Sequence, residues 1–311
     1  MALHAKDRSD KKNLENFYAL TIILFLVLIS VKSKEATATF GLLVASKVEY
    51  ATSSISFSFE PIVEENYLQA KTYVVYDVVN KKVLFGQNEN QVVSLASMTK
   101  LMTAIAAKEL TSGDTIITIR PEAIEAGYDI GLKNGQMWKM NELIKYMLVF
   151  SSNDVANLLA TSITSREAFI AKMNEIAKRE GMNTLVFTNP NGLDGPGFFG
   201  GRGSAVDVAL LMSYAYKTIP SLIDATSKSR ATVFSSTGPV SGVPNTNQVV
   251  DKFVGIEGSK TGFTDEAGGN LVMIFDVAIG HPIVIVVTGS TRTERFSDVE
   301  KLYDRTKKAL Q

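Results

Sequence analysis

The chain has 311 residues, 45% of them hydrophobic, and its 32 basic and 32 acidic residues leave no formal net charge. A chain of this length can bury a large core, and its balanced charge creates no overall field that would attract nucleic acid. The sequence contains no cysteine and only two histidines, His4 and His281. Thiol catalysis is therefore excluded, and a zinc peptidase with its usual histidine ligands is disfavoured. We expect no metal or other cofactor, so lysine or carboxylate groups would have to move protons in any enzyme built from this sequence.

The N-terminal part of the chain is predicted to direct the protein out of the cytoplasm. Residues 17–31 form an uncharged, strongly apolar run with basic residues before it. A helix of this length would reach only ~22 Å, against a hydrocarbon core of ~30 Å, which suits a signal peptide or a short signal anchor. The positive flank places the N-terminus inside and everything after the run outside. Residues 1–38 are thus interpreted as a cytoplasmic stub with a signal peptide or anchor; an A-x-A pattern at 36–38 leaves cleavage open.

A linker rich in Ser, Thr and Ala is predicted over residues 39–60, followed by one folded domain over residues 61–311. Strand patterns open the domain, helical patterns fill its middle, and strands with one helix end it. The first strands are predicted at 72–77 and 83–85. Helices are predicted at 97–110, 141–150, 154–163, 166–180 and 205–216, strands at 232–236, 255–263, 270–279 and 282–289, and a closing helix at 294–310. A capping box of Thr164 and Glu167 is predicted to start the helix 166–180.

This order of elements predicts an α+β fold. An antiparallel sheet would be formed by both ends of the domain and flanked by helices, with a helical lobe beside it. Two other patterns have ordinary structural interpretations. His281 lies in a predicted turn between apolar strands, which disfavours a Ser-His-Asp triad. The formal GxGxxG in the Gly-rich segment 189–204 lacks the strand-to-helix context of a dinucleotide site, so we predict a long loop near the active site.

The first motif that carries chemistry is Ser97-Met98-Thr99-Lys100. Positions i and i+3 share one face of a helix, so the Ser97 hydroxyl and the Lys100 amine are expected to meet. A serine hydroxyl becomes a good nucleophile only when a neighbour takes its proton, and a lysine of lowered pKa can act as that base. Taken alone, SxxK also occurs by chance on surface helices.

Two further motifs follow in the chain. Ser151-Ser152-Asn153 lies between two predicted helices, where a turn can project the Ser151 hydroxyl and the Asn153 amide into a cleft. By itself this pattern is ordinary helix capping. Lys260-Thr261-Gly262 lies in a predicted strand, where Gly262 allows another element to approach closely. Lys260 and Thr261 would hold an anionic substrate terminus there.

In combination and in this order, the three motifs resemble the signature set of the low-molecular-mass penicillin-binding proteins, the D-alanyl-D-alanine carboxypeptidases of serine peptidase family S11. The resemblance covers about residues 65–300 and includes the surroundings of each motif. Its matching segments are Ser94 to Ala104, Phe150 to Asp154, Phe187 to Asp194 and Gly258 to Thr264. It departs at Leu95, where the family usually has proline.

The resemblance implies a β-lactamase/transpeptidase-like fold and a role for each site residue. Ser97 would attack the D-Ala-D-Ala bond of a peptidoglycan stem peptide, with Lys100 as base, and Ser151 would help to pass the proton to the departing D-alanine. Asn153, Lys260, Thr261, Gly262 and Phe263 would bind the substrate, and the backbone N–H groups of Ser97 and Phe263 would form the oxyanion hole. Residues 61–311 would then be a D,D-peptidase domain on the extracytoplasmic side of a bacterial membrane, held there by the N-terminal segment. β-Lactams would trap Ser97 covalently.

Three alternatives stay open. A D,D-endopeptidase that cleaves peptidoglycan cross-links would use the same residues. A class A β-lactamase needs a glutamate that activates the deacylating water, and the only acidic residue between Gly181 and Ser204 is Asp194. A non-catalytic peptidoglycan-binding module would not need the intact motifs.

Overall fold

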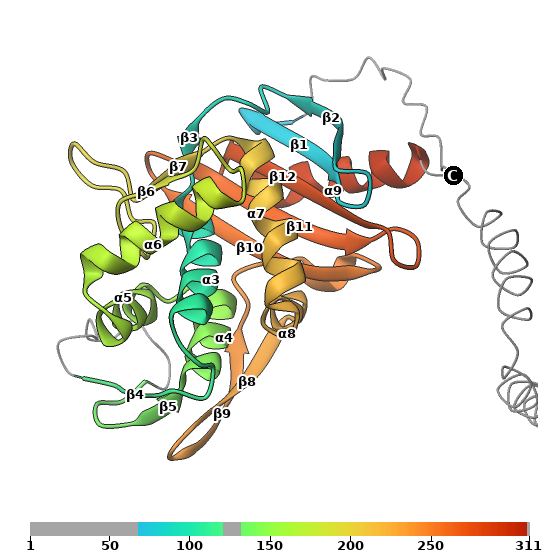
Figure 1. The fold of residues 1–311 in the computed structure, drawn as a ribbon. Coiled ribbons are helices and arrows are strands. Elements are labelled where there is room, and N and C mark those ends of the chain that lie inside the picture. Colours follow the sequence, from blue (N-terminus) through green and yellow to red (C-terminus); the bar gives the residue numbers. More distant parts are fainter. Residues whose placement is uncertain (1–67, 121–131, 310–311) are drawn as a thin grey trace, which may run out of the picture. The chain divides into compact units, whose positions relative to one another are not determined.

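The central element of the computed structural model, which describes residues 68–120 and 132–309, is a five-stranded antiparallel sheet. The chain supplies two strands before the helical region and three after it. These are β1 (Thr72–Asp77), β2 (Lys82–Gln87), β10 (Ile256–Thr264), β11 (Gly268–Asp276) and β12 (Pro282–Ser290). Their spatial order is β10-β11-β12-β1-β2, so early and late segments pair at β1 and β12 (Figure 1). The predicted α+β fold, with a sheet completed by both ends of the domain, is confirmed.

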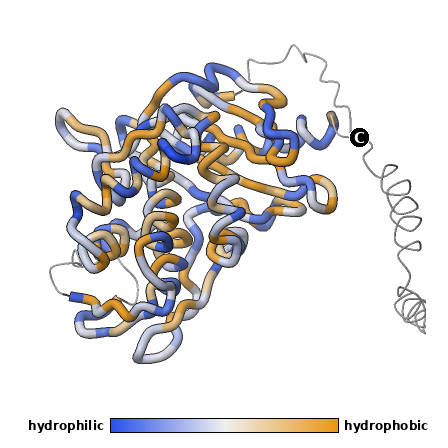
Figure 2. The backbone as a smooth tube through the Cα atoms, viewed as in Figure 1, coloured by the Kyte–Doolittle hydropathy of each residue, from blue (hydrophilic) through white to orange (hydrophobic). Residues whose placement is uncertain are grey.

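Both faces of this sheet are covered, because its central strands carry buried apolar side chains on both sides. On β12, Ile283, Ile285 and Val287 face one hydrophobic cluster, and Val284 and Val286 face another, as the alternation of side chains along a strand requires. The first cluster is closed by α9 (Glu294–Ala309) and the second by α7 (Ala205–Thr218) and the helices beyond it. Hydrophobic residues accordingly concentrate along these strands (Figure 2).

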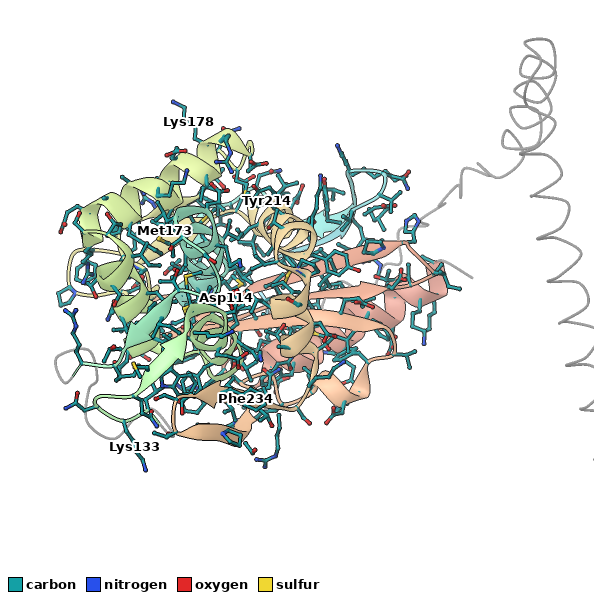
Figure 3. All side chains as sticks on the ribbon, turned by 60° about the horizontal axis from the view of Figure 1, so that its bottom comes forward. Asp114, Lys133, Met173, Lys178, Tyr214 and Phe234 are labelled. Atoms are coloured by element: carbon teal, nitrogen blue, oxygen red, sulfur yellow. The ribbon has the colours of Figure 1, made fainter. Side chains whose placement is uncertain are left out.

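The helical lobe is organised around α3 (Lys100–Leu110), whose first eight residues, 100–107, are all buried. Helix α3 contacts α4 (Met140–Phe150), α5 (Asn153–Ile163), α6 (Arg166–Arg179) and α7. The outer helix α6 is amphipathic: Met173 is fully buried, and Lys178 projects away from the lobe (Figure 3). A helix surrounded on all sides positions its first residues rigidly, and those residues include Lys100.

The remaining short elements connect the sheet to the lobe, and among their strands only β8 was predicted, at 232–236. One small sheet has the order β3-β7-β6 and another the order β4-β5-β8-β9. Their strands are β3 (Val93–Ser94), β4 (Ile116–Thr118), β5 (Met137–Lys139), β6 (Val186–Phe187), β7 (Gly201–Gly203), β8 (Arg230–Ser235) and β9 (Gly238–Pro244). The remaining pieces are η2 (Ala96–Thr99), α8 (Pro220–Asp224), η4 (Ala225–Ser227) and η5 (Val250–Lys252). Strands this short carry too few alternating residues to be recognised.

The predicted leader at 17–31 and the linker at 39–60 lie outside the described residues. Within residues 68–120 and 132–309, no helix is both long enough and apolar enough to cross a membrane.

His281 is a turn residue, as its sequence context predicts. It lies between β11 and β12, where its backbone N–H donates to the Ala278 carbonyl at 2.7 Å. Its Nε2 atom lies 3.0 Å from a carboxylate oxygen of Asp77, at the end of β1. The ring therefore joins two neighbouring turns of the sheet.

The start of α6 differs from the predicted capping box. The N-cap is Ser165, whose hydroxyl accepts a hydrogen bond from the Ala168 backbone N–H at 3.2 Å, and Thr164 belongs to the end of α5. The prediction was wrong by one residue because Thr164 and Ser165 are both good N-cap residues, and the sequence alone does not choose between them.

We expect Ser165→Ala to lower the free energy of unfolding by about 1 kcal/mol, because an N-cap hydroxyl satisfies a backbone donor of the first turn. The melting temperature should fall by about 2–4 °C for a domain of this size. Thr164→Ala is the matched control and should have the smaller effect. Thermal unfolding of the two variants gives the two melting temperatures. A larger loss for Thr164→Ala than for Ser165→Ala would show that Thr164 is the N-cap.

Candidate active site

Ser97 and Lys100 lie at the junction of η2 and α3, at the centre of the molecule's helical lobe. Lys100 is fully buried. Its Nζ atom lies 2.7 Å from Ser97 Oγ, 2.7 Å from Asn153 Oδ1 and 2.6 Å from the carbonyl oxygen of Asn191. One nitrogen thus touches the candidate nucleophile and two fixed oxygen acceptors, so the predicted meeting of the SxxK side chains is present.

The second motif forms the turn between α4 and α5. Ser151 ends α4 with a left-handed backbone (φ 66°), a conformation that is uncommon for non-glycine residues and often marks functional sites. Ser152 caps α5 by accepting from the Val155 N–H at 3.0 Å. The capping role therefore belongs to Ser152, while Ser151 and Asn153 carry the contacts to the two lysines.

Lys260 is buried at the middle of β10, the edge strand of the main sheet. Its Nζ atom lies 2.8 Å from Ser151 Oγ and 2.9 Å from the Thr261 carbonyl oxygen. Burial lowers the pKa of Lys260 well below the ordinary lysine value, and the charges of Lys100 and Arg295 lower it further. The neutral form of this amine is therefore more accessible than that of an ordinary lysine.

Gly262 allows β10 to lie directly against the segment that carries Ser97. A Cβ atom at this position would lie 2.7 Å from the Leu95 carbonyl oxygen and 3.3 Å from the Ser97 nitrogen. Any side chain would push the strand away from this segment. The close approach predicted for this glycine is therefore present, and the partner is backbone.

These residues surround one cleft of about 390 Å³. Its lining comprises Ser97, Ser151, Thr246, Gln248, Thr261, Gly262, Phe263, Arg292, Thr293, Arg295 and Phe296. Lys100 and Lys260 lie behind the two serines and contact them. The structure therefore brings together every site residue that the sequence predicted, and their roles stay predictions. On the same strand, Thr261 Oγ1 lies 2.6 Å from Thr246 Oγ1.

Arg295 is the principal residue that the sequence motifs missed. Its side chain is 8% exposed, its Nη1 donates to the Gly262 carbonyl at 2.7 Å, and its Nε has no hydrogen-bond partner within the described residues. Burial lowers the pKa of Arg295 to about 10, with a further contribution from the charge of Arg292. One signal could have found it: Arg295, Val299 and Leu302 occupy one buried stripe of α9, where an arginine is out of place.

Across the part of the chain that the structure describes, no group of three or more His, Asp or Glu side chains is arranged to hold a metal ion.

Both the sequence and the structure of this chain are similar to those of known proteins. The family model of the D-alanyl-D-alanine carboxypeptidases, peptidase S11, matches residues 60–291. D-alanyl-D-alanine carboxypeptidase DacF of Bacillus subtilis is 30% identical over 243 residues, which cover 76% of this chain and 61% of that protein. The chain thus spans less than two thirds of the length of this relative.

Two further proteins are informative. The D-alanyl-D-alanine endopeptidase of Haemophilus influenzae is 33% identical over 214 residues, or 67% of this chain and 71% of that protein. Penicillin-binding protein D2 of Listeria monocytogenes, solved in its ampicillin-bound form, is 31% identical with a TM-score of 0.68 and covers 79% of this chain and 99% of that one. The β-lactamase/transpeptidase-like fold expected from the motifs is confirmed by this likeness.

The buried Lys260 predicts a pH dependence of stability. Its pKa is lowered in the native state, so the unfolded chain binds more protons at this site between that lowered value and the ordinary 10.5. Stability therefore rises with pH in this window. We expect Lys260→Met to be more stable than the wild type at neutral pH and to show a flatter rise. Urea unfolding between about pH 7 and pH 10 measures this slope.

Lys217→Met, at an exposed position near the end of α7, is the control and should keep the slope of the wild type. If Lys260→Met and Lys217→Met give the same slope, the amine of Lys260 is not held in its neutral form.

Proposed function

We propose that this chain, which belongs to the peptidase S11 family of D-alanyl-D-alanine carboxypeptidases, is a serine-type carboxypeptidase that removes the terminal D-alanine of peptidoglycan stem peptides. One observation carries the proposal. Two serine hydroxyls open into the same cleft, each backed by a buried lysine: Ser97 by Lys100 at 2.7 Å and Ser151 by Lys260 at 2.8 Å. This arrangement provides a nucleophile, a base and a separate proton route to a leaving amine.

In the acylation step, Ser97 Oγ attacks the carbonyl carbon of the penultimate D-alanine and gives its proton to Lys100. A neutral lysine amine has two N–H groups and one lone pair. The N–H groups match the oxygens of Asn153 and Asn191, which leaves the lone pair for the Ser97 proton. The C–N bond then breaks, and Ser151, held by Lys260, gives its hydroxyl proton to the departing D-alanine nitrogen. The proton that Lys100 took from Ser97 passes across the cleft to restore the Ser151 hydroxyl. In deacylation, water attacks the acyl carbon, Lys100 accepts the proton of the water, and this proton returns to Ser97 Oγ as the ester bond breaks.

The free carboxylate of the substrate is proposed to bind between β10 and α9. Thr261 and Arg295 line this part of the cleft. The buried Nε–H of Arg295 has no hydrogen-bond acceptor within the described residues, and a buried donor normally has one. A carboxylate would supply that acceptor.

Asp194 separates the proposal from a β-lactamase. It is the only acidic residue between Gly181 and Ser204, and its carboxylate accepts hydrogen bonds from Ser94, Thr264 and the Gly200 N–H. Because these donors occupy its oxygens, Asp194 is not proposed to activate a deacylating water. A β-lactam acyl-enzyme on Ser97 is therefore expected to be long-lived, and penicillins are proposed as covalent inhibitors.

The location of the protein forms part of the proposal. Peptidoglycan stem peptides lie outside the cytoplasm, and the apolar run at 17–31 with its basic flank provides a signal peptide or a signal anchor. We therefore place residues 61–311, as the D,D-peptidase domain, on the extracytoplasmic side of a bacterial cell membrane, with residues 39–60 as the linker.

The test is release of free D-alanine from a pentapeptide ending in D-Ala-D-Ala, paired with mass spectrometry after incubation with a fluorescent penicillin. The wild type should release D-alanine and carry a stable adduct on Ser97. Ser97→Ala should lose the adduct and lower release by on the order of 10⁴-fold or more, and Ser165→Ala should keep both. Adduct formation that survives Ser97→Ala would overturn the assignment of the nucleophile.

The same assays distinguish the alternatives. Release from cross-linked muropeptides but not from the pentapeptide would indicate an endopeptidase, rapid loss of the adduct a β-lactamase, and neither release nor adduct a binding module.

A second prediction concerns the carboxylate site. Arg295→Ala should lower kcat/KM for the pentapeptide by about 10²-fold, because it removes a buried charged partner of the substrate. Arg292→Ala should have a smaller effect, because Arg292 is exposed at the rim and its guanidinium lies on the Phe263 ring, 4.2 Å from the centroid. Steady-state kinetics of both variants decide the order. Equal losses of kcat/KM in the two variants would show that the substrate carboxylate does not bind at Arg295.

A further inference from the structure

The carboxylate of Asp194 joins three segments that meet around the cleft. Ser94 Oγ lies 2.9 and 2.8 Å from its two oxygens, Thr264 Oγ1 donates at 2.5 Å and the Gly200 N–H donates at 3.0 Å. Ser94 and Thr264 are 100 and 70 residues from Asp194 in the chain. One side chain thereby connects β3, the end of β10 and the loop that precedes β7.

The positions of these partners relative to the site make the connection informative. Ser94 lies three residues before Ser97, and Thr264 directly follows Phe263. Between them, Gly262 lies against the backbone of Leu95 and Ser97 and the small side chain of Ala96. Gly262 itself has no side chain that could hold the strand at a set distance, so groups at the margins of this contact help to set its spacing.

The other margin of this contact is held by Arg295. Its Nη1 donates to the Gly262 carbonyl oxygen, which belongs to the peptide whose N–H is that of Phe263. The C=O and N–H of a trans peptide point in opposite directions, so Arg295 fixes the orientation of this N–H. Asp194 then fixes how far the strand lies from the nucleophile segment.

Resting on the proposed function, we propose that Asp194 is a positioning residue that sets the distance between the Ser97 segment and β10. It thereby aligns the backbone N–H groups of Ser97 and Phe263 on the oxyanion that forms during acylation. It acts through Thr264 and Ser94 and does not touch the substrate. Because such donors act mainly in the transition state, their misalignment lowers kcat more than it raises KM.

The test is a double-mutant cycle between Asp194 and Thr264, with kcat and KM measured for D-alanine release. Rates are divided by the amount of enzyme that fluorescent penicillin labels to completion, so an unfolded fraction does not count. We expect Asp194→Ala and Thr264→Val each to lower kcat by about 10- to 100-fold, as a misplacement of about 1 Å does, with KM changed by less than about 3-fold. Thr264→Ser, which keeps the hydroxyl, should retain kcat.

The double variant should be no slower than Asp194→Ala alone, because both changes remove the same connection. Asp207→Ala is the matched control: this buried carboxylate also joins distant segments, accepting from the Thr184 N–H and hydroxyl at 2.6 and 2.7 Å, and it does not line the cleft. It should lower the melting temperature and leave kcat per labelled enzyme unchanged.

Two kinds of result would overturn the inference while leaving the proposed function intact. The first is that the wild type is active and both Asp194→Ala and Thr264→Val keep its kcat. The second is that the kcat of the double variant falls by the product of the two single losses. If Asp194→Ala does not fold, the kcat of Thr264→Val compared with that of Thr264→Ser still tests whether the hydroxyl that donates to Asp194 is needed. A wild type that takes no label and releases no D-alanine would overturn the proposed function itself.

Discussion

The site depends on the contact between the edge strand β10 and the backbone that carries Ser97. Gly262 makes that contact possible, because a Cβ atom there would lie 2.7 Å from the Leu95 carbonyl oxygen. The sheet brings Lys260 and Thr261 to the cleft from one side, and the buried helix α3 brings Lys100 from the other. Neither layer contains the site by itself. Chemistry is thus tied to the packing of sheet on lobe, and a loosened interface would separate the two lysines before it unfolded either layer.

Three basic side chains are buried near one another in this site. Lys100 and Lys260 are almost completely inaccessible and Arg295 is 8% exposed. No carboxylate makes an ion pair with Lys260 or Arg295 within the described residues. The hydrogen bonds of the three side chains include hydroxyl, amide and carbonyl oxygens. An acidic partner would stabilise the charged form of Lys260 and oppose the lowering of its pKa by burial. The neutral oxygens orient these groups, and a cluster of basic side chains suits an anionic peptide terminus.

Much of this arrangement could be predicted from the sequence, because the information is local. Short runs of β-branched apolar residues, such as β12, and long amphipathic helices can be recognised locally, and three short motifs identify the serines and lysines. Arg295 could not be placed in the same way. Its role depends on α9 folding back across the sheet edge, which no local pattern encodes. The cap of α6 was misplaced by one residue because Thr164 and Ser165 are equally good caps, and the choice rests on where α5 ends.

Asp194 illustrates how far a local pattern can carry an interpretation. The sequence marks it as the only acidic residue between Gly181 and Ser204, which by itself gives it no role. The fold supplies one, because donors from three segments occupy its oxygens. A carboxylate that accepts from three segments can serve as a fixed point between them. In the mechanism proposed above, amines move the protons in this cleft and the acid holds the backbone in place. That division of labour explains how a site of this kind works without histidine, cysteine or a catalytic glutamate among its contacts.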